Sequence, residues 1–110
     1  MIRVTFDTFY SGKTTVLINK GRYAGNKTTA LIATCGNPEN YGEPWGTISV
    51  NLGIKLNDDE IFADINNCKS LVDAMVEQNL LIPTGITQQS GFVNYPLMKL
   101  SKELQELTYF

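Results

Sequence analysis

The sequence predicts one α+β domain over residues 1–110, with a mostly antiparallel sheet of about five strands and one main helix packed on one face. Three observations carry this expectation. One stretch alternates apolar and polar residues, another repeats apolar residues at helical spacing, and 43% of the 110 residues are hydrophobic while 18% are charged. That composition is typical of a globular chain long enough to bury a core.

The stretch from Glu43 to Leu52 is expected to form the middle of the sheet. Ile48, Val50 and Leu52 alternate with polar residues, and a two-residue period is typical of a half-buried strand. Pro44 stands at its start, where a missing N–H does least harm to a ladder.

The other expected strands follow from β-branched runs bounded by turn residues. Gly12 separates the first two, the 21–26 stretch forms a turn, and a turn precedes the strand that starts at Ile61. Proline interrupts the last strand at Pro96. The expected ranges are 2–6, 14–19, 28–35, 61–65 and 92–100.

The main helix is expected at 71–79. Leu71, Val72, Met75, Val76 and Leu80 recur at spacings that build one apolar stripe. The candidate N-terminal caps are Asn66, Asn67 and the Ser70/Asp73 pair, and Asn79 is a plausible left-handed stop. Pro83 forbids continuation, residues 84–91 are expected to form a loop, and a short terminal helix is expected over 101–107.

The predicted core lies between the sheet and the helix. It takes the apolar residues of the strand centres and of the helical stripe: Ile48, Val50, Ile61, Ile65, Leu71, Val72 and Met75.

Charge is unevenly distributed along the chain. Residues 1–35 hold five basic residues against Asp7, for a net charge of +4, whereas residues 36–110 hold four lysines against ten acids, for −6. The basic half offers Lys20, Arg22 and Lys27 to phosphate or to an acidic surface. Pairing of oppositely charged strands within one sheet is the simpler alternative.

The search for catalytic motifs indicates no enzyme. The chain contains no histidine, which excludes Ser-His-Asp and Cys-His mechanisms and histidine-ligated metals. Gly12-Lys13-Thr14 lacks the earlier glycine of a phosphate loop, and the acidic turn Asp58-Asp59-Glu60 lacks the spacing of a calcium loop. We therefore expect no cofactor and no metal.

Aromatic residues in turns are the remaining candidates for binding. Tyr23 follows Arg22, and Tyr41 lies near Trp45, the only tryptophan. Aromatic and arginine side chains supply most binding hot spots and also stack on unpaired bases. Packing of Trp45 over the sheet edge is an equally good interpretation.

Several separated blocks resemble those of a known family. They are Glu43-Pro44-Trp45 with Val50-Asn51-Leu52, then Phe62 to Cys68, Pro83 to Thr87, and Ser90 to Leu97. Together they are similar to a family of small uncharacterised bacterial proteins found on conjugative elements, plasmids and phages. This chain departs from the family pattern at Ile86, where an arginine is usual, and at Trp45, where a tyrosine is usual.

The resemblance implies a counter-defence role, because a similar gut-bacterial protein is associated with inhibition of a CRISPR nuclease. It carries over no catalytic residues. The leading hypothesis is a non-catalytic inhibitor that binds a host defence effector, of Cas9 type, by protein–protein contact. Its candidate partner-binding residues are Asp58, Asp59, Glu60, Tyr41 and Trp45.

The alternative is an accessory single-stranded nucleic-acid-binding protein of a mobile element. Its candidate residues are Lys20, Arg22, Tyr23 and Lys27, although a sequence pI near 5.0 argues against strong nonspecific binding to DNA. A chain without a signal peptide, with Cys35 and Cys68 as free thiols, is expected in the cytoplasm, with no membrane association.

Overall fold

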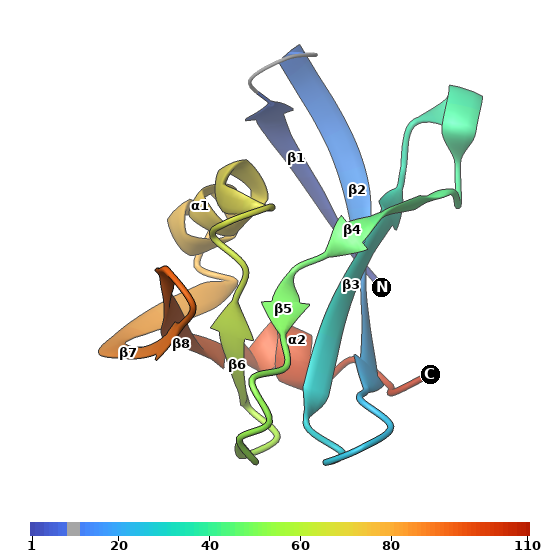
Figure 1. Ribbon diagram of the computed structural model, residues 1–110. Helices are drawn as coiled ribbons and strands as arrows, with labels where there is room; N and C mark the ends of the chain where they lie inside the picture. Colours follow the sequence, from blue (N-terminus) through green and yellow to red (C-terminus); the bar gives the residue numbers. More distant parts are fainter. Residues whose placement is uncertain (9–11) are drawn as a thin grey trace.

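A computed structural model describes residues 1–8 and 12–110, and it contains two four-stranded antiparallel sheets (Figure 1). The first sheet has the order β1-β2-β3-β4 and the second has the order β5-β6-β8-β7. Strands contain 50% of the described residues and helices contain 15%. The strands are β1 (Ile2–Thr8), β2 (Gly12–Arg22), β3 (Thr29–Cys35), β4 (Pro44–Thr47), β5 (Ser49–Val50), β6 (Glu60–Ala63), β7 (Leu81–Ser90) and β8 (Val93–Leu100).

The prediction of an α+β domain with a helix packed across one five-stranded sheet is therefore wrong. Two local features cause the error. The alternating stretch that was expected to form one central strand is divided between the two sheets, and the stretch expected to form a loop before the last strand is itself a long strand.

Ile48 is the residue at which the chain passes from one sheet to the other. Its N–H donates to the carbonyl of Leu31 in the first sheet, and its own carbonyl accepts from the N–H of Asp64, just after β6; both bonds are 2.8 Å long. The residues before it form β4 and those after it form β5, each an edge strand. The period-2 pattern of this stretch thus spans a corner between sheets, and the predicted sheet centre is wrong.

The β7–β8 hairpin contradicts the expectation of a loop over residues 84–91. Pro83 is compatible with β7 because β7 is an edge strand. The register shifts between Pro83 and Thr87, and Gly85 has a φ of 83°, which fits a bulge that absorbs the irregularity. Beyond it, pairing continues to a two-residue turn at Gly91 and Phe92.

Helix α1 (Lys69–Glu77) begins two residues earlier than predicted, and it buries Leu71, Val72 and Met75. Cys68 stands at its N-cap without a side-chain cap bond, so none of the expected caps is used. Asn79 has a φ of 60°, which confirms the left-handed stop.

A short helix, α2 (Lys102–Gln105), is capped by Ser101, whose Oγ accepts from the N–H of Leu104. The 3-10 helix η1 (Pro38–Asn40) lies between β3 and β4. In the described residues, no helix is long and apolar enough to cross a membrane.

One core joins both sheets and α1. The first sheet contributes alternate residues such as Val4, Val16 and Ile18, because only one face of each strand points inward. Of the predicted core residues, Ile48, Ile61, Leu71, Val72 and Met75 are fully buried, whereas Ile65 is partly buried against the core and Val50 is half-buried.

Candidate functional site

Three of the predicted charged residues meet around Tyr109. We call this group the Tyr109 cluster: Lys20, Arg22, Asp58 and Tyr109. Arg22 Nη1 lies 2.9 Å from Asp58 Oδ1, and Nη2 donates to Oδ2 over 3.2 Å. The guanidinium carbon of Arg22 stands 3.9 Å from the centre of the Tyr109 ring. The hydrogen bond from Arg22 holds the pKa of the Asp58 carboxyl below its usual value.

Lys20 is buried, with only 3% of its surface exposed. It continues the inward-facing row of Val16 and Ile18 on β2, so its side chain starts from the core face of the strand. Nζ donates to the carbonyl of Gln105 over 2.7 Å and stands 4.4 Å from the centre of the Tyr109 ring. Burial, and then the charge of Arg22, lower the pKa of Lys20.

The rest of the acidic turn is also engaged within the chain. Asp59 Oδ2 lies 3.9 Å from Nζ of Lys99, and Glu60 Oε1 accepts from the N–H of Asn57. Lys27 adopts a φ of 62° in the turn after β2, and its carbonyl accepts from Arg22. The acidic residues predicted to bind a protein and the basic residues predicted to bind nucleic acid are therefore partly paired with each other, since Arg22 binds Asp58.

Two of the predicted aromatic contacts point into the protein. The Tyr23 hydroxyl lies 2.8 Å from Ser49 Oγ, and burial raises the pKa of Tyr23. Trp45 is half-buried and packs edge-on against Phe6, with ring centres 5.6 Å apart and an interplanar angle of 85°. Trp45 thus packs over the sheet edge, as its alternative interpretation held.

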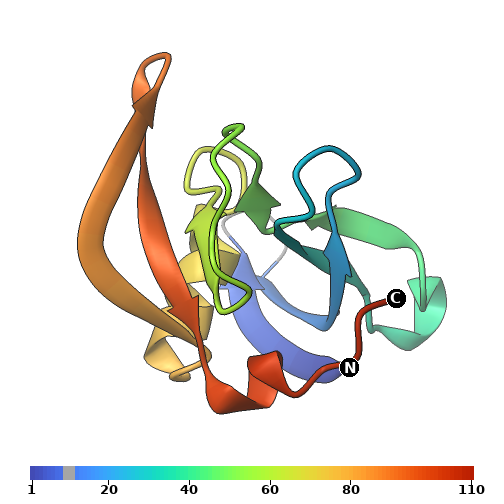
Figure 2. The ribbon, with the colours of Figure 1, turned by 90° about the horizontal axis from the view of Figure 1, so that it is seen from below.

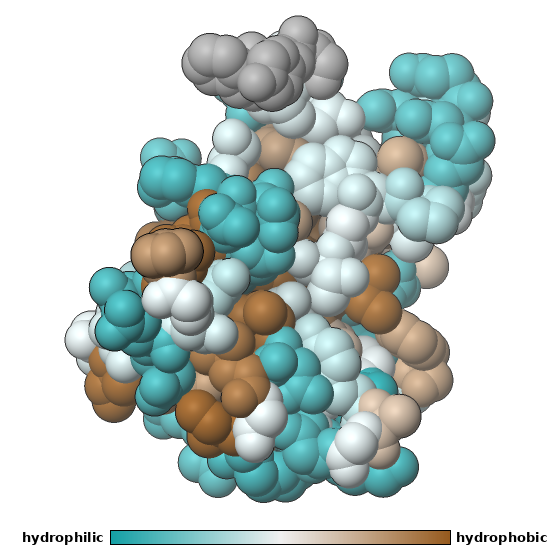
Figure 3. All heavy atoms as spheres, in the orientation of Figure 1, coloured by the Kyte–Doolittle hydropathy of each residue, from teal (hydrophilic) through white to brown (hydrophobic). Residues whose placement is uncertain are grey.

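Tyr41 is the predicted aromatic residue that faces solvent, with 61% of its surface exposed. It belongs to the loop of residues 36–43 between β3 and β4, which we call the Tyr41 loop. Figure 1 shows this loop projecting from the body, and Figure 3 shows a hydrophilic surface there. Glu39 and Glu43 on the same loop are also exposed.

Backbone hydrogen bonds hold the Tyr41 loop in shape. The N–H of Cys35 donates to the Glu43 carbonyl and the N–H of Gly42 donates to the Cys35 carbonyl, each over 2.8 Å. Asn37 Nδ2 also donates to Thr14 Oγ1 on β2. The Tyr41 ring is therefore presented from a fixed backbone.

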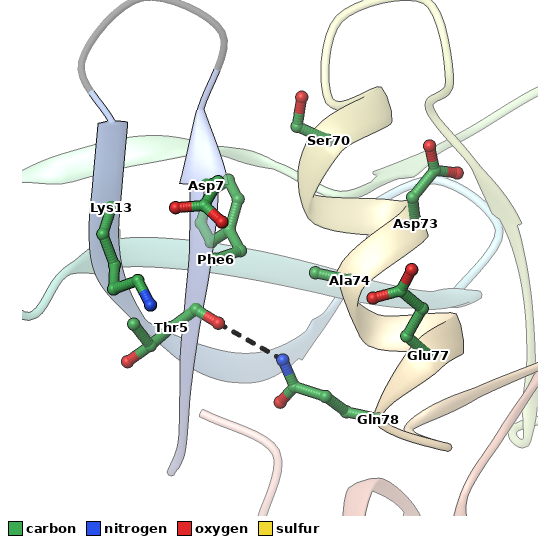
Figure 4. Close-up of a pocket in the computed structure, with 9 residues that line it drawn as sticks. All are labelled: Thr5, Phe6, Asp7, Lys13, Ser70, Asp73, Ala74, Glu77 and Gln78. Atoms are coloured by element: carbon green, nitrogen blue, oxygen red, sulfur yellow. Dashed lines mark hydrogen bonds between the residues drawn. The ribbon is translucent and has the colours of Figure 1, made fainter.

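A groove of about 360 Å³ lies between α1 and the β1–β2 pair (Figure 4). The Gln78 amide closes one end by donating to the Thr5 carbonyl over 3.3 Å. Asp7 and its cross-strand neighbour Lys13 line the strand side of the groove, and Glu77 lines the α1 side. Asp73, also on the α1 side, pairs with Lys69 at 3.0 Å. The lining of the groove is mainly polar.

Two further features of the described residues concern metal ligands and cysteines. They contain no group of three or more histidine, cysteine or acidic side chains placed to hold a metal ion. Cys35 and Cys68 are free and buried, and burial raises the pKa of the Cys68 thiol. Cys68 Sγ donates to the Thr47 carbonyl over 3.3 Å, so it lies in the core next to the crossover between sheets.

Sequence reasoning missed Tyr109, which completes the Tyr109 cluster, and Gln105, whose carbonyl accepts from Lys20. No local pattern marks them, because the 85 positions that separate Lys20 from Gln105 are spanned only in the folded chain. The inward position of Lys20 did have a signal, since it continues the two-residue period of Val16 and Ile18.

A family model described as "Domain of unknown function (DUF4313)" matches residues 18–109. No curated protein and no solved structure matches the chain.

Proposed function

We propose that the chain, which belongs to the DUF4313 family, acts by binding another protein and catalyses no reaction. The partner is a nuclease effector of a bacterial defence system, of Cas9 type, and the chain inhibits it in the cytoplasm on behalf of a mobile element. The resemblance to proteins of conjugative elements and phages motivates the choice of partner, and the geometry of the Tyr41 loop supports binding.

The observation that carries this proposal is the exposed ring of Tyr41 on a hydrogen-bonded loop. Tyrosine is enriched among binding hot spots, and a backbone already fixed before binding loses little entropy on association. Glu39 and Glu43, two positions before and after Tyr41, are exposed on the same loop and give it negative charge. That charge complements the basic channel through which a Cas9-type effector holds nucleic acid.

The alternative, binding of single-stranded nucleic acid, has weaker support. Arg22 is paired with Asp58, and Lys20 is buried against Gln105 and Tyr109. A phosphate would have to displace these contacts. The proposed mechanism therefore uses the Tyr41 loop rather than the basic residues.

A DNA-cleavage assay with a Cas9-type effector tests the proposal. Tyr41→Ala should weaken inhibition at least tenfold, and Glu39→Lys with Glu43→Lys should slow association more at low salt than at high salt. Neither change should alter the free energy of unfolding by more than about 0.5 kcal/mol, because the side chains are exposed.

Phe92→Ala is the matched control, since Phe92 is another exposed aromatic on a distant hairpin. Equal inhibition by the parent and by Tyr41→Ala would rule out the Tyr41 loop as the contact surface. A gel shift of a single-stranded oligonucleotide by the parent, abolished by Arg22→Ala, would favour the alternative.

A further inference from the structure

The outer half of the β7–β8 hairpin stands apart from the rest of the molecule (Figure 2). Strand β6 pairs with β8 only from Leu97 onward, so Thr87 to Ser90 and Val93 to Pro96 form a ribbon of two strands. Every residue from Gly85 to Phe92 is exposed. A ribbon of two strands without a third is only marginally stable in water, and additional strand pairing would stabilise it.

Both strands of this ribbon have a free edge, and the edge of β7 is the better donor because Pro96 on β8 has no N–H. The register of β7 with β8 identifies the backbone groups of β7 that face outward. A two-residue turn makes Ser90 and Val93 a hydrogen-bonded pair, and such pairs alternate along an antiparallel ladder. Gln88 and Tyr95 are then the next bonded pair. The N–H and C=O groups of Thr87 and Gln89 point away from β8.

Two details agree with this assignment. Pro96, which has no N–H, lies opposite Thr87 in a pair that needs none. The Gln89 carbonyl accepts the side-chain amide of its neighbour Gln88 over 3.3 Å, so it is not used in the ladder. The edge of β7 therefore offers two donors and two acceptors to an incoming strand.

The hairpin also lacks charge. Every charged residue of the chain lies outside the stretch from Gln78 to Met98. Natural edge strands commonly carry lysine or another charge that prevents pairing between copies. Two copies with a net charge of −2 each can approach along this uncharged edge without repulsion between like charges at the contact.

We infer that β7 pairs antiparallel with β7 of a second copy of this chain. The outward groups set the register, with Thr87 opposite Gln89 of the second copy and Gln88 opposite Gln88 on the two-fold axis. Four backbone hydrogen bonds form, from two residues of each copy. The two ribbons then continue one sheet across the dimer, and the exposed Ile86 becomes partly shielded from water.

The register makes cross-linking a direct test. Gln88 faces its own counterpart in a non-hydrogen-bonded pair, where Cα atoms are about 4.5 Å apart, within reach of a disulfide. Gln88→Cys should give a covalent dimer on oxidation. Thr87→Cys is the matched control, because its counterpart is diagonal to it, beyond the ~6.8 Å limit. The native cysteines do not interfere, since both are buried.

Light scattering across a dilution series measures the same contact without a new cysteine. Gln89→Pro removes an outward N–H and leaves the ladder of the hairpin intact, so this variant should be monomeric where the parent is dimeric. Asn94→Pro, opposite it on β8, removes an outward N–H from the other edge and should remain dimeric. Unchanged circular dichroism would establish that both variants fold.

Three results would overturn the inference. They are a parent that is monomeric throughout the dilution series, a dimer that persists in Gln89→Pro, and equal cross-linking of Thr87→Cys and Gln88→Cys. In the first case the edge is free or is taken by a strand of a different protein. The inference is independent of the proposed function, because Tyr41→Ala should leave the dimer intact.

Discussion

Truncation of Ile48 provides the sharpest test of the two-sheet architecture. Ile48 is fully buried, and its N–H and C=O groups each bond to a different sheet. Replacement by alanine removes three carbon groups, worth about 0.8 kcal/mol each in transfer free energy, and leaves a cavity that the two sheets cannot close without moving. We therefore expect Ile48→Ala to lower the free energy of unfolding by about 3–4 kcal/mol, within the usual range for such changes.

Val50→Ala is the control that distinguishes the two architectures. In a single central strand, Ile48 and Val50 would share one buried face and their truncations would cost similar amounts. In the structure, Val50 is half-buried on a two-residue edge strand. Its truncation should therefore cost less than about 1 kcal/mol.

Urea denaturation of the three proteins, read by linear extrapolation, measures both losses. The slope of the free energy of unfolding against urea concentration should be the same for all three proteins, so that a shift of the midpoint urea concentration reports the change in stability. Similar losses for Ile48→Ala and Val50→Ala would refute the crossover at Ile48, as would a loss for Ile48→Ala no larger than that of a surface change.

Two further predictions concern buried titratable groups. Burial lowers the pKa of Lys20 in the folded protein, whereas in the unfolded chain it is about 10.4. Between these two pKa values the folded protein binds fewer protons than the unfolded chain. The free energy of unfolding should therefore rise with pH in that window. The difference between the parent and Lys20→Met should show this rise in pH-dependent urea melts, and a flat difference would contradict it. The Cys68 thiol, buried and with a raised pKa, should not react with a thiol reagent at neutral pH until urea unfolds the chain; rapid labelling of the native protein would be evidence against its place in the core.

Local sequence patterns identified most of the individual elements. Runs of β-branched residues between turns identified the first strands, the 3.6-residue stripe identified α1, and Asn79 identified its end. Each of these signals depends on residues only a few positions apart. Strand β7 was missed because Pro83, Gly85 and the Ser90-Gly91 pair are typical of loops, whereas β8 matches the strand predicted over 92–100. Only the edge position of β7 makes proline and a bulge compatible with a strand.

The candidate sites divide in the same way. Tyr41 was identified from the sequence as a turn aromatic, and the structure adds the backbone bonds that fix its loop. The pairing of Arg22 with Asp58, across 36 positions, was not predictable. The sequence shows that both halves of the chain hold charged residues, but it does not show which of them pair.

The sequence by itself determined most local conformations, β7 excepted, and the absence of histidine chemistry, because these follow from side-chain type and short spacing. Only the tertiary structure decided that Ile48 turns the chain from one sheet into another. Long-range backbone pairing and burial in the shared core decide which strand lies beside which. The two-residue period of side chains looks the same whether a stretch stays in one sheet or continues into a second sheet, so the sequence pattern did not reveal the crossover.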